Sequence, residues 1–224
     1  MELLVVTLAH ITPGRDTDGL AHIRLISDTV RNAPGLIISR FYRSRGHDSY
    51  YFMLTTWEDE ESWRRAQERY NPKQLLLGST AELLLDPPEQ WLMHYQWGYS
   101  RPAKQPIVSA AHITTLRPDQ ARLAQREWIT GLRKQTTKPT LAFAFLAQEI
   151  DRDATAPFRT VKPLRAEARA EEKFVYYQGT TLLNFLSWAS ETEREEFYKD
   201  PHYQSIKKLL QSLAVTRILP LEQV

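Results

Sequence analysis

The sequence predicts an α+β fold in which one βαββαβ module occurs twice in tandem. Two observations carry this prediction: a sequence pattern that recurs about a hundred residues apart, and strands that are apolar on both faces. With 224 residues, the chain is long enough for two modules of about 100 residues, each able to bury a core. We therefore place the first repeat at residues 1–103 and the second at 104–224.

The first strand of each repeat carries the same tetrapeptide. Ala-His-Ile-Thr occurs at residues 9–12 and again at 111–114, an offset of 102 residues. On this alignment His10 and His112 are equivalent positions, each within an otherwise apolar strand.

Each repeat continues in the same order of elements. Apolar residues recur at helical spacing, a proline ends the helix, two strands follow, and an acidic helix and a last strand complete the module. A proline-containing polar linker joins the repeats, and a loop at 151–172 interrupts the second one. The expected strands are 3–12, 36–42, 50–56, 91–99, 107–114, 141–150, 174–186 and 215–221.

The third strand of the first repeat is apolar on both faces, with Tyr50, Phe52 and Leu54 on one and Tyr51, Met53 and Trp57 on the other. Helices can cover only one face, so the second face requires another sheet, and the other repeat can supply it. We therefore expect two ferredoxin-like βαββαβ repeats whose antiparallel sheets pack as a pseudo-dimeric α+β barrel. An apolar slot in the barrel interior, ending at Asn184, would be the binding site.

Composition narrows the class of partner. The chain has no cysteine, which excludes disulfides and thiolate chemistry and favours the cytoplasm. Its net charge of +2 comes from 29 basic and 27 acidic residues that are interspersed, so neither nucleic acid nor a membrane surface is an expected partner. The aromatic residues, which include six Trp and ten Tyr, must cover a core, an interface or an apolar pocket, of which a core is the simplest. The expected partner is a small apolar or aromatic molecule. The chain would be a monomer with an internal pseudo-dimer, and further homodimer formation stays open.

Motifs for cofactors and metals are missing from the sequence. It contains no Gly-x-Gly-x-x-Gly, no phosphate-binding loop and no Gly-x-Ser-x-Gly, and it has only eight glycines with which to build such turns. Its histidines do not show the short spacing of metal ligands. We therefore expect neither a cofactor nor a metal.

The order of elements, the Trp that ends the third strand of each repeat, the acidic helix behind it and the Asn-Pro or Asp-Pro break in that helix resemble the dimeric α+β barrel superfamily. Within it, the chain is most similar to the antibiotic biosynthesis monooxygenase family. The resemblance implies oxidation of a polycyclic phenol by dioxygen, without metal or flavin, on a site that contains an Asn and, four residues later, a Trp. Asn184 and Trp188 have this spacing, whereas the first repeat has Met53 and Trp57.

The resemblance therefore implies Asn184 and Trp188 as catalytic residues. We add His112 as a general base, because the pKa of histidine lies near neutrality. Expected substrate-binding residues are His10, Met53, Trp57 and Tyr177. In the structural alternative, the tryptophans anchor the core, Asn184 caps a strand end and the histidines are hydrogen-bonded core residues.

Three residues depart from the patterns of two groups of relatives. Arg194 stands where the quinone-forming enzymes tend to have a Tyr, six residues after the Trp. Haem-degrading relatives resemble the chain less, because Gln67 and Tyr198 stand where they have a haem-ligating His. The monooxygenase hypothesis thus stands beside two others: a non-catalytic barrel that binds an apolar ligand or a protein partner, and a haem-binding or haem-degrading protein.

Overall fold

The computed structural model describes residues 1–46, 48–150 and 179–224. In the first repeat, its strands and helices follow the expected order. These elements are β1 (Leu3–Ile11), α1 (Asp16–Arg31), β2 (Leu36–Ser44), β3 (Tyr50–Trp57), α2 (Glu60–Tyr70), α3 (Pro72–Ser79), the 3-10 helix η1 (Ala81–Leu83) and β4 (Leu84–Ser100). The helix after the third strand is broken into two, α2 and α3.

The second repeat has the same order of strands and helices. The whole loop predicted at 151–172, and the expected start of the strand at 174, lie outside the described residues. The elements are β5 (Val108–Leu116), α4 (Pro118–Thr136), β6 (Leu141–Glu149), β7 (Thr180–Trp188), α5 (Glu191–Lys199), α6 (Pro201–Leu213) and β8 (Ala214–Gln223).

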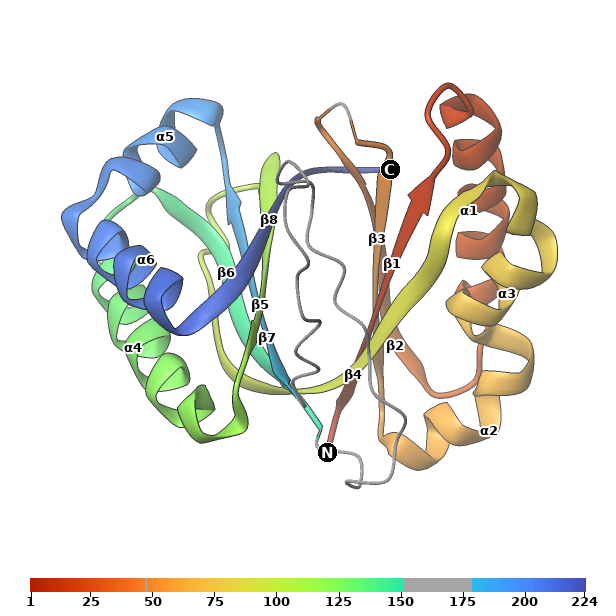
Figure 1. Cartoon of the computed structure of the whole chain (residues 1–224), viewed down its shortest axis with the longest axis horizontal. Helices are drawn as coiled ribbons and strands as arrows, with labels where there is room; N and C mark the ends of the chain where they lie inside the picture. Colours follow the sequence, from red (N-terminus) through yellow and green to blue (C-terminus); the bar gives the residue numbers. More distant parts are fainter. Residues whose placement is uncertain (47, 151–178) are drawn as a thin grey trace, which may run out of the picture.

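The eight strands form one closed antiparallel barrel in the order β1-β3-β2-β8-β5-β7-β6-β4. Each repeat contributes four neighbouring strands, and its last strand pairs with the second strand of the other repeat: β4 with β6, and β8 with β2. The helices of the two repeats lie on opposite flanks of the barrel, as Figure 1 shows. The predicted pseudo-dimeric α+β barrel is therefore confirmed.

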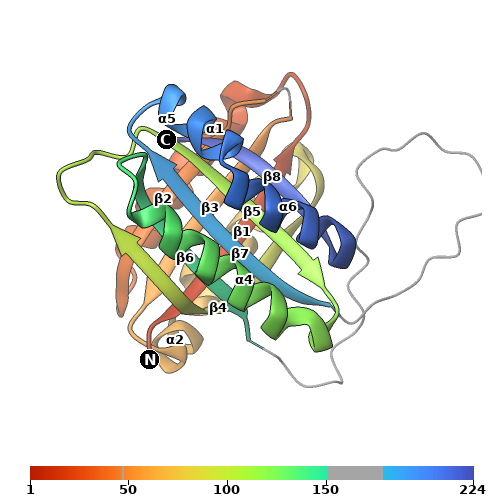
Figure 2. The ribbon, with the colours of Figure 1, turned by 90° about the vertical axis from the view of Figure 1, so that its left-hand side faces the viewer.

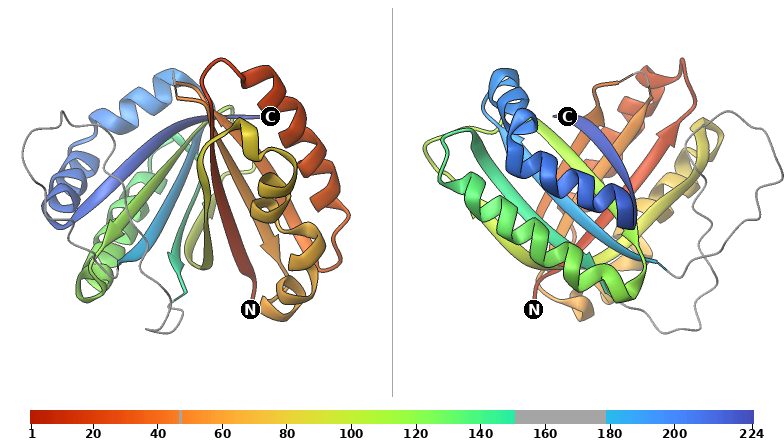
Figure 3. Two further views of the ribbon diagram at one scale, coloured as in Figure 1. Left: turned by 45° about the vertical axis from the view of Figure 1, so that its right-hand side comes forward. Right: turned by 60° about the vertical axis from the view of Figure 1, so that its left-hand side comes forward.

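Strands β1, β3, β5 and β7, in the middle of the two halves of the barrel, are buried on both faces. Apolar side chains of both repeats fill the barrel interior, among them Leu54, Trp91, Phe185 and Leu219. Separate apolar clusters lie between each sheet and its own helices, on the two sides seen in Figure 3. The interior is thus a packed core shared by the repeats, which explains why neither sheet would be stable with that face in water.

The acidic helix of each repeat breaks at a proline, as the sequence indicated. Asn71 and Asp200 cap α3 and α6 by accepting hydrogen bonds from backbone N–H groups of the first turn, and each precedes a proline at the first helical position. Figure 2 shows α4 and α6 lying next to each other across the outer face of the second sheet. This layer covers the candidate site.

The two repeats are offset by 105 residues in their first strands, and not by the 102 that the shared tetrapeptide suggested. Leu3 pairs with Trp57 in the first repeat, and Val108 pairs with Trp188 in the second. A shift of three residues is odd, so it places the two copies of Ala-His-Ile-Thr on opposite faces of their sheets. The predicted equivalence of His10 and His112 is therefore wrong.

Among the described residues, no helix combines the length and the apolar character that crossing a membrane requires.

Candidate active site

The side chains of His112, Asn184 and Trp188 lie between the second sheet and its helices. His112 is on β5, and Asn184 and Trp188 are on β7. Strand β7 points Leu183 and Phe185 into the barrel, so the alternate residues, Asn184 and Trp188 included, point outward toward α4, α5 and α6. The expectation that these residues line the barrel interior is wrong, because that interior is filled by the other face of the same strands.

The sheet brings His112 and Asn184 together. They are directly opposed in the β5–β7 ladder, and opposed residues on one face of an antiparallel pair lie about 5 Å apart at their Cβ atoms. Trp188 lies four residues along β7 on the same face, about 13 Å from Asn184 along an extended strand. All three side chains are buried.

Tyr198 connects the histidine to the tryptophan. His112 Nε2 lies 2.9 Å from the Tyr198 hydroxyl, and the two rings are nearly parallel, with an interplanar angle of 8°. The Trp188 ring lies 5.7 Å from the same tyrosine ring. Trp128 of α4 and Tyr203 of α6 approach the edge of the imidazole. The imidazole is thus enclosed by aromatic rings from all three helices.

Several buried polar atoms in this layer have no hydrogen-bond partner. They are both amide atoms of Asn184 and the indole N–H groups of Trp188 and Trp128. Buried polar groups are normally paired, because each unpaired one costs about 1–3 kcal/mol. These three residues in one layer can therefore donate hydrogen bonds to a ligand from three nitrogen atoms, and accept from it at Asn184 Oδ1.

Burial governs the protonation states around His112. It lowers the pKa of His112 to about 3, with a smaller contribution from the positive charge of Lys207. It also raises the pKa of the Tyr198 hydroxyl, which the positive charge of Arg194 opposes, and that of the Tyr203 hydroxyl. The imidazole is therefore neutral at neutral pH, and the expectation of a histidine pKa near neutrality is wrong for His112.

At the equivalent strand positions of the first repeat, the polar side chains are paired, although His22 Nδ1 on α1 is buried without a partner. Thr7 stands in the position of His112, and it accepts a hydrogen bond from Gln90 Nε2 at 3.0 Å. The Trp57 indole donates to Thr55 Oγ1 at 3.0 Å. Met53, opposite Thr7, is fully buried and packs toward α1 and α3. Met53 and Trp57, expected to bind substrate, therefore lie in the core and present no unpaired polar atom.

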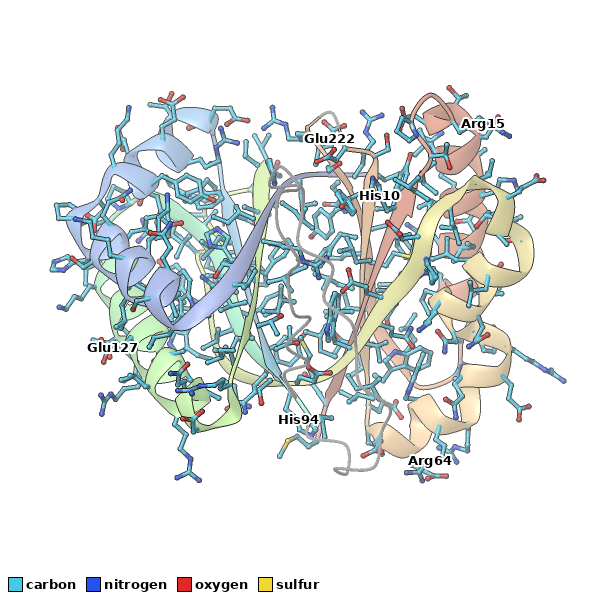
Figure 4. All side chains as sticks on the ribbon, viewed as in Figure 1. His10, Arg15, Arg64, His94, Glu127 and Glu222 are labelled. Carbon is cyan, nitrogen blue, oxygen red and sulfur yellow. The ribbon has the colours of Figure 1, made fainter. Side chains whose placement is uncertain are left out.

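His10 is not brought to this site. His10 points to the barrel side of β1 and stacks on Tyr50 with ring centroids 4.2 Å apart, and Figure 4 shows it at the end of the barrel where Glu222 lies. Tyr177 lies outside the described residues. The residues that the sequence prediction left out are Trp128 and Tyr198: the first reads only as an apolar helix position, and the second was noted only because it is not a histidine.

The arrangement can hydrogen-bond an aromatic ligand that carries oxygen atoms at two ends. The Asn184 amide and the indole N–H groups can donate to such oxygens, while the rings supply flat apolar contact. A pocket of about 250 Å³ lies elsewhere, against α1 and β2. Because the side chains of His112, Asn184 and Trp188 are buried, a ligand reaches them only if the helices move. Among the described residues, no group of three or more His, Asp or Glu side chains is placed to hold a metal ion.

Comparison with known proteins identifies a domain in the first repeat. Residues 3–70 match the model of the antibiotic biosynthesis monooxygenase family. No curated protein matches the chain in sequence. The family match covers the first repeat, whereas the unpaired polar atoms lie in the second.

Solved structures share the fold over the whole chain at low sequence identity. An anthrone oxidase-like protein has a TM-score of 0.71 at 12% identity, covering 100% of this chain and 91% of its own. A proposed monooxygenase from Fusobacterium nucleatum has a TM-score of 0.66 at 6% identity, covering 99% and 92%. A regulator of staphylococcal pathogenesis has a TM-score of 0.54 at 10% identity, covering 98% and 99%. One fold thus serves proteins of different kinds.

Proposed function

Because the chain carries an antibiotic biosynthesis monooxygenase domain and folds throughout as the α+β barrel of such proteins, we propose that it is a monooxygenase that oxidises an aromatic, polycyclic phenol with dioxygen. The observation that carries the proposal is the set of unpaired polar atoms on Asn184, Trp188 and Trp128 beside His112. A phenolic ligand with two oxygens suits them, because its oxygens can accept from the amide and indole N–H groups and its phenolic O–H can donate to Asn184 Oδ1.

In the proposed reaction a ring CH₂ of an anthrone-type substrate becomes a ring C=O. The substrate first loses a proton to form its phenolate, which transfers electrons to dioxygen. One oxygen atom enters the product and the other leaves as water with the two hydrogens of the CH₂ group. The substrate supplies the electrons for this step, so no external reductant is needed.

Asn184 and Trp188 would hold the two ends of the substrate and stabilise the phenolate by hydrogen bonding. His112 would accept the phenolic proton in place of its hydrogen bond with Tyr198. The low pKa of His112 does not prevent this, since a phenolate formed next to the imidazole raises the pKa of the histidine. Tyr198 would then turn away from the histidine, which opens space at the end of α5.

The similar solved structures agree with the proposed fold, but the proposal of this chemistry does not depend on them. The anthrone oxidase-like protein matches the complete chain, but 12% identity supports the fold alone. The activity is therefore argued from the second-repeat residues themselves.

The test compares Asn184→Leu with Met53→Leu, which places the same residue at the equivalent position of the first repeat. Oxygen uptake with an anthrone substrate is expected to fall about 100-fold in Asn184→Leu and to stay near the wild-type rate in Met53→Leu. The free energy of unfolding is expected to rise in Asn184→Leu by about 1–3 kcal/mol, because the change removes two unpaired buried polar atoms.

Loss of turnover together with higher stability is the mark of a residue kept for function. Unchanged oxygen uptake in Asn184→Leu, or no uptake with any anthrone or hydroquinone in the wild-type protein, would remove the proposed roles.

Full burial of the site favours one second candidate, a barrel that binds an aromatic ligand without turning it over. Asn184 is 1% exposed and Trp188 is 0% exposed, so a ligand could be held tightly behind closed helices. A ligand that purifies with the protein and leaves Asn184→Leu, in a protein that consumes no oxygen, would support this candidate.

A further inference from the structure

Two arginines reach across the barrel from one repeat to the other, and only one of them has a carboxylate partner among the described residues. Arg217 of β8 places its guanidinium 5.7 Å from the centre of the Trp91 ring on β4. It also donates two hydrogen bonds to Glu89, at 2.5 and 2.9 Å. The guanidinium of Arg217 is thus neutralised by a carboxylate with two hydrogen bonds and also lies against an aromatic ring.

Glu89, the partner of Arg217, occupies the position in the first repeat that is equivalent to Arg217 in the second. Glu89 pairs with Leu8 of β1, and Arg217 pairs with Ile113 of β5; Leu8 and Ile113 are equivalent at the offset of 105 residues. The two side chains therefore meet across the pseudo-twofold axis of the barrel. Opposite charges at equivalent positions neutralise this end of the interior.

Arg40 of β2 lies toward the other end of the interior. It shares a face with Tyr42, which belongs to the barrel core, and its guanidinium lies 5.4 Å from the centre of the Phe143 ring on β6. The geometry over the ring matches that of Arg217. No ion pair among the described residues includes Arg40, although surface arginines on either side of it in the sequence, Arg31 and Arg43, have carboxylate partners.

Aromatic rings and hydroxyls surround this cation. Phe143 packs near Phe145, which meets Tyr95 edge-on at 5.2 Å. Burial raises the pKa of the Tyr42 and Tyr95 hydroxyls, and the positive charge of Arg40 opposes both shifts, so the cation lies near both. Arg40 also donates a hydrogen bond to the Tyr42 hydroxyl, a neutral partner that leaves its positive charge uncompensated. The Tyr95 hydroxyl lies 2.8 Å from Thr56 Oγ1, and this hydrogen bond fixes the position of the Tyr95 ring.

Solvent reaches this end of the barrel. Ile38, two residues before Arg40 on the same strand, is 44% exposed, and Tyr95 is 37% exposed. Strands β2 and β8 pair only through Tyr42 to Ser44 and Leu221 to Gln223, so within the described residues the sheet is open beside Arg40. A ligand can therefore approach Arg40 without the helix movement that the candidate active site requires.

We propose that this end of the barrel binds an aromatic carboxylate, whose anionic group pairs with Arg40 and whose ring lies against Tyr95 and Ile38. The carboxylate would supply to Arg40 what Glu89 supplies to Arg217. A planar guanidinium favours a carboxylate, which it can bind with two parallel hydrogen bonds. The flat apolar surroundings favour an aromatic ring over an aliphatic chain.

Calorimetric titration with 1-naphthoate tests the proposal, with the uncharged 1-naphthamide as the matched ligand. We expect naphthoate to bind at least about tenfold more tightly than the amide, and Arg40→Met to lose that difference. Arg40→Lys keeps the positive charge but cannot form two parallel hydrogen bonds, so it should bind naphthoate with intermediate affinity. This variant still tests the proposal if Arg40→Met does not fold. Arg122→Met, which removes an exposed arginine of α4, should bind as the wild type does.

Asn184→Leu is the variant that separates this site from the candidate active site. It should bind naphthoate as tightly as the wild type does, whatever its effect on oxygen uptake. Equal affinity of naphthoate for Arg40→Met and the wild type, no preference for naphthoate over the amide, or loss of binding in Asn184→Leu would each overturn the proposal.

Discussion

At the scale of single residues, the unusual feature is a polar group buried without a partner. Asn184 and Trp188 could be singled out from the sequence, because their spacing resembles that of an enzyme family and a strand places them on one face. That their polar atoms are unpaired could not be predicted, since it depends on which side chains the helices bring over the sheet. The misassignment of His10 has a physical cause as well: a shared tetrapeptide out of register by an odd number of residues points to the opposite face.

Burial of a neutral histidine predicts how stability depends on pH. In the folded protein His112 stays neutral down to a pH of about 3, whereas in the unfolded chain it takes up a proton below pH 6.5. The unfolded state therefore binds more protons between these values, and the contribution to the free energy of unfolding is full above pH 6.5 and is lost as the pH falls, by about 1.4 kcal/mol per pH unit.

Urea denaturation at several pH values between 6.5 and about 5 measures this dependence. His112→Gln should show a shallower decrease in the free energy of unfolding over the same range. Parallel curves for the two proteins would mean that His112 titrates alike in the folded and unfolded states.

At the scale of elements, the strands and helices follow from periodicity and proline breaks, whereas their lengths depend on the partner strands. The breaks at Asn71 and Asp200 were predictable because each is an N-cap residue before a proline. Strand β4 extends from Leu84 to Ser100, well beyond the expected 91–99 at its start, because its first half pairs with β1 and its second half with β6. The added residues at its start pair with β1 of the same repeat, and after two leucines they are polar residues or prolines, so their own sequence does not read as a strand.

The connection between α1 and β2 depends on glycine. Gly35 has a φ of +78°, and a Cβ placed there would lie 2.7 Å from the Cβ of Ser62 in α2. Gly35→Ala is expected to lower the free energy of unfolding by about 1–3 kcal/mol, because it adds both backbone strain and a steric clash.

Gly14→Ala is the matched control for Gly35→Ala. Gly14 has a similar φ of +84°, but no atom lies within 4 Å of its Cβ position, so only the backbone strain applies. Chemical denaturation should rank Gly35→Ala as the more destabilising change. The reverse order would show that contact with α2 does not constrain this turn.

At the scale of the whole molecule, one chain supplies both halves of a barrel, and this lets the halves differ. In the first repeat, Thr7 and Trp57 at the equivalent strand positions are hydrogen-bonded, whereas in the second repeat the polar atoms of Asn184 and Trp188 are unpaired. The same asymmetry appears across the pseudo-twofold axis, where Glu89 meets Arg217. The barrel itself was predictable, because strands that are apolar on both faces need a second sheet; that the interior is filled, and that the candidate site lies outside it, was not.

The central claim is that a phenolic ligand binds between the second sheet and its helices. The most direct measurement is a titration of the protein with an anthrone-type phenol, followed by NMR of the tryptophan indole N–H signals, assigned with Trp→Phe variants. The indole signals of Trp188 and Trp128 should shift, because these groups lack a partner in the free protein, while that of Trp57, already bonded to Thr55, should stay in place. A shift of the Trp57 signal with those of Trp188 and Trp128 unchanged would contradict the account.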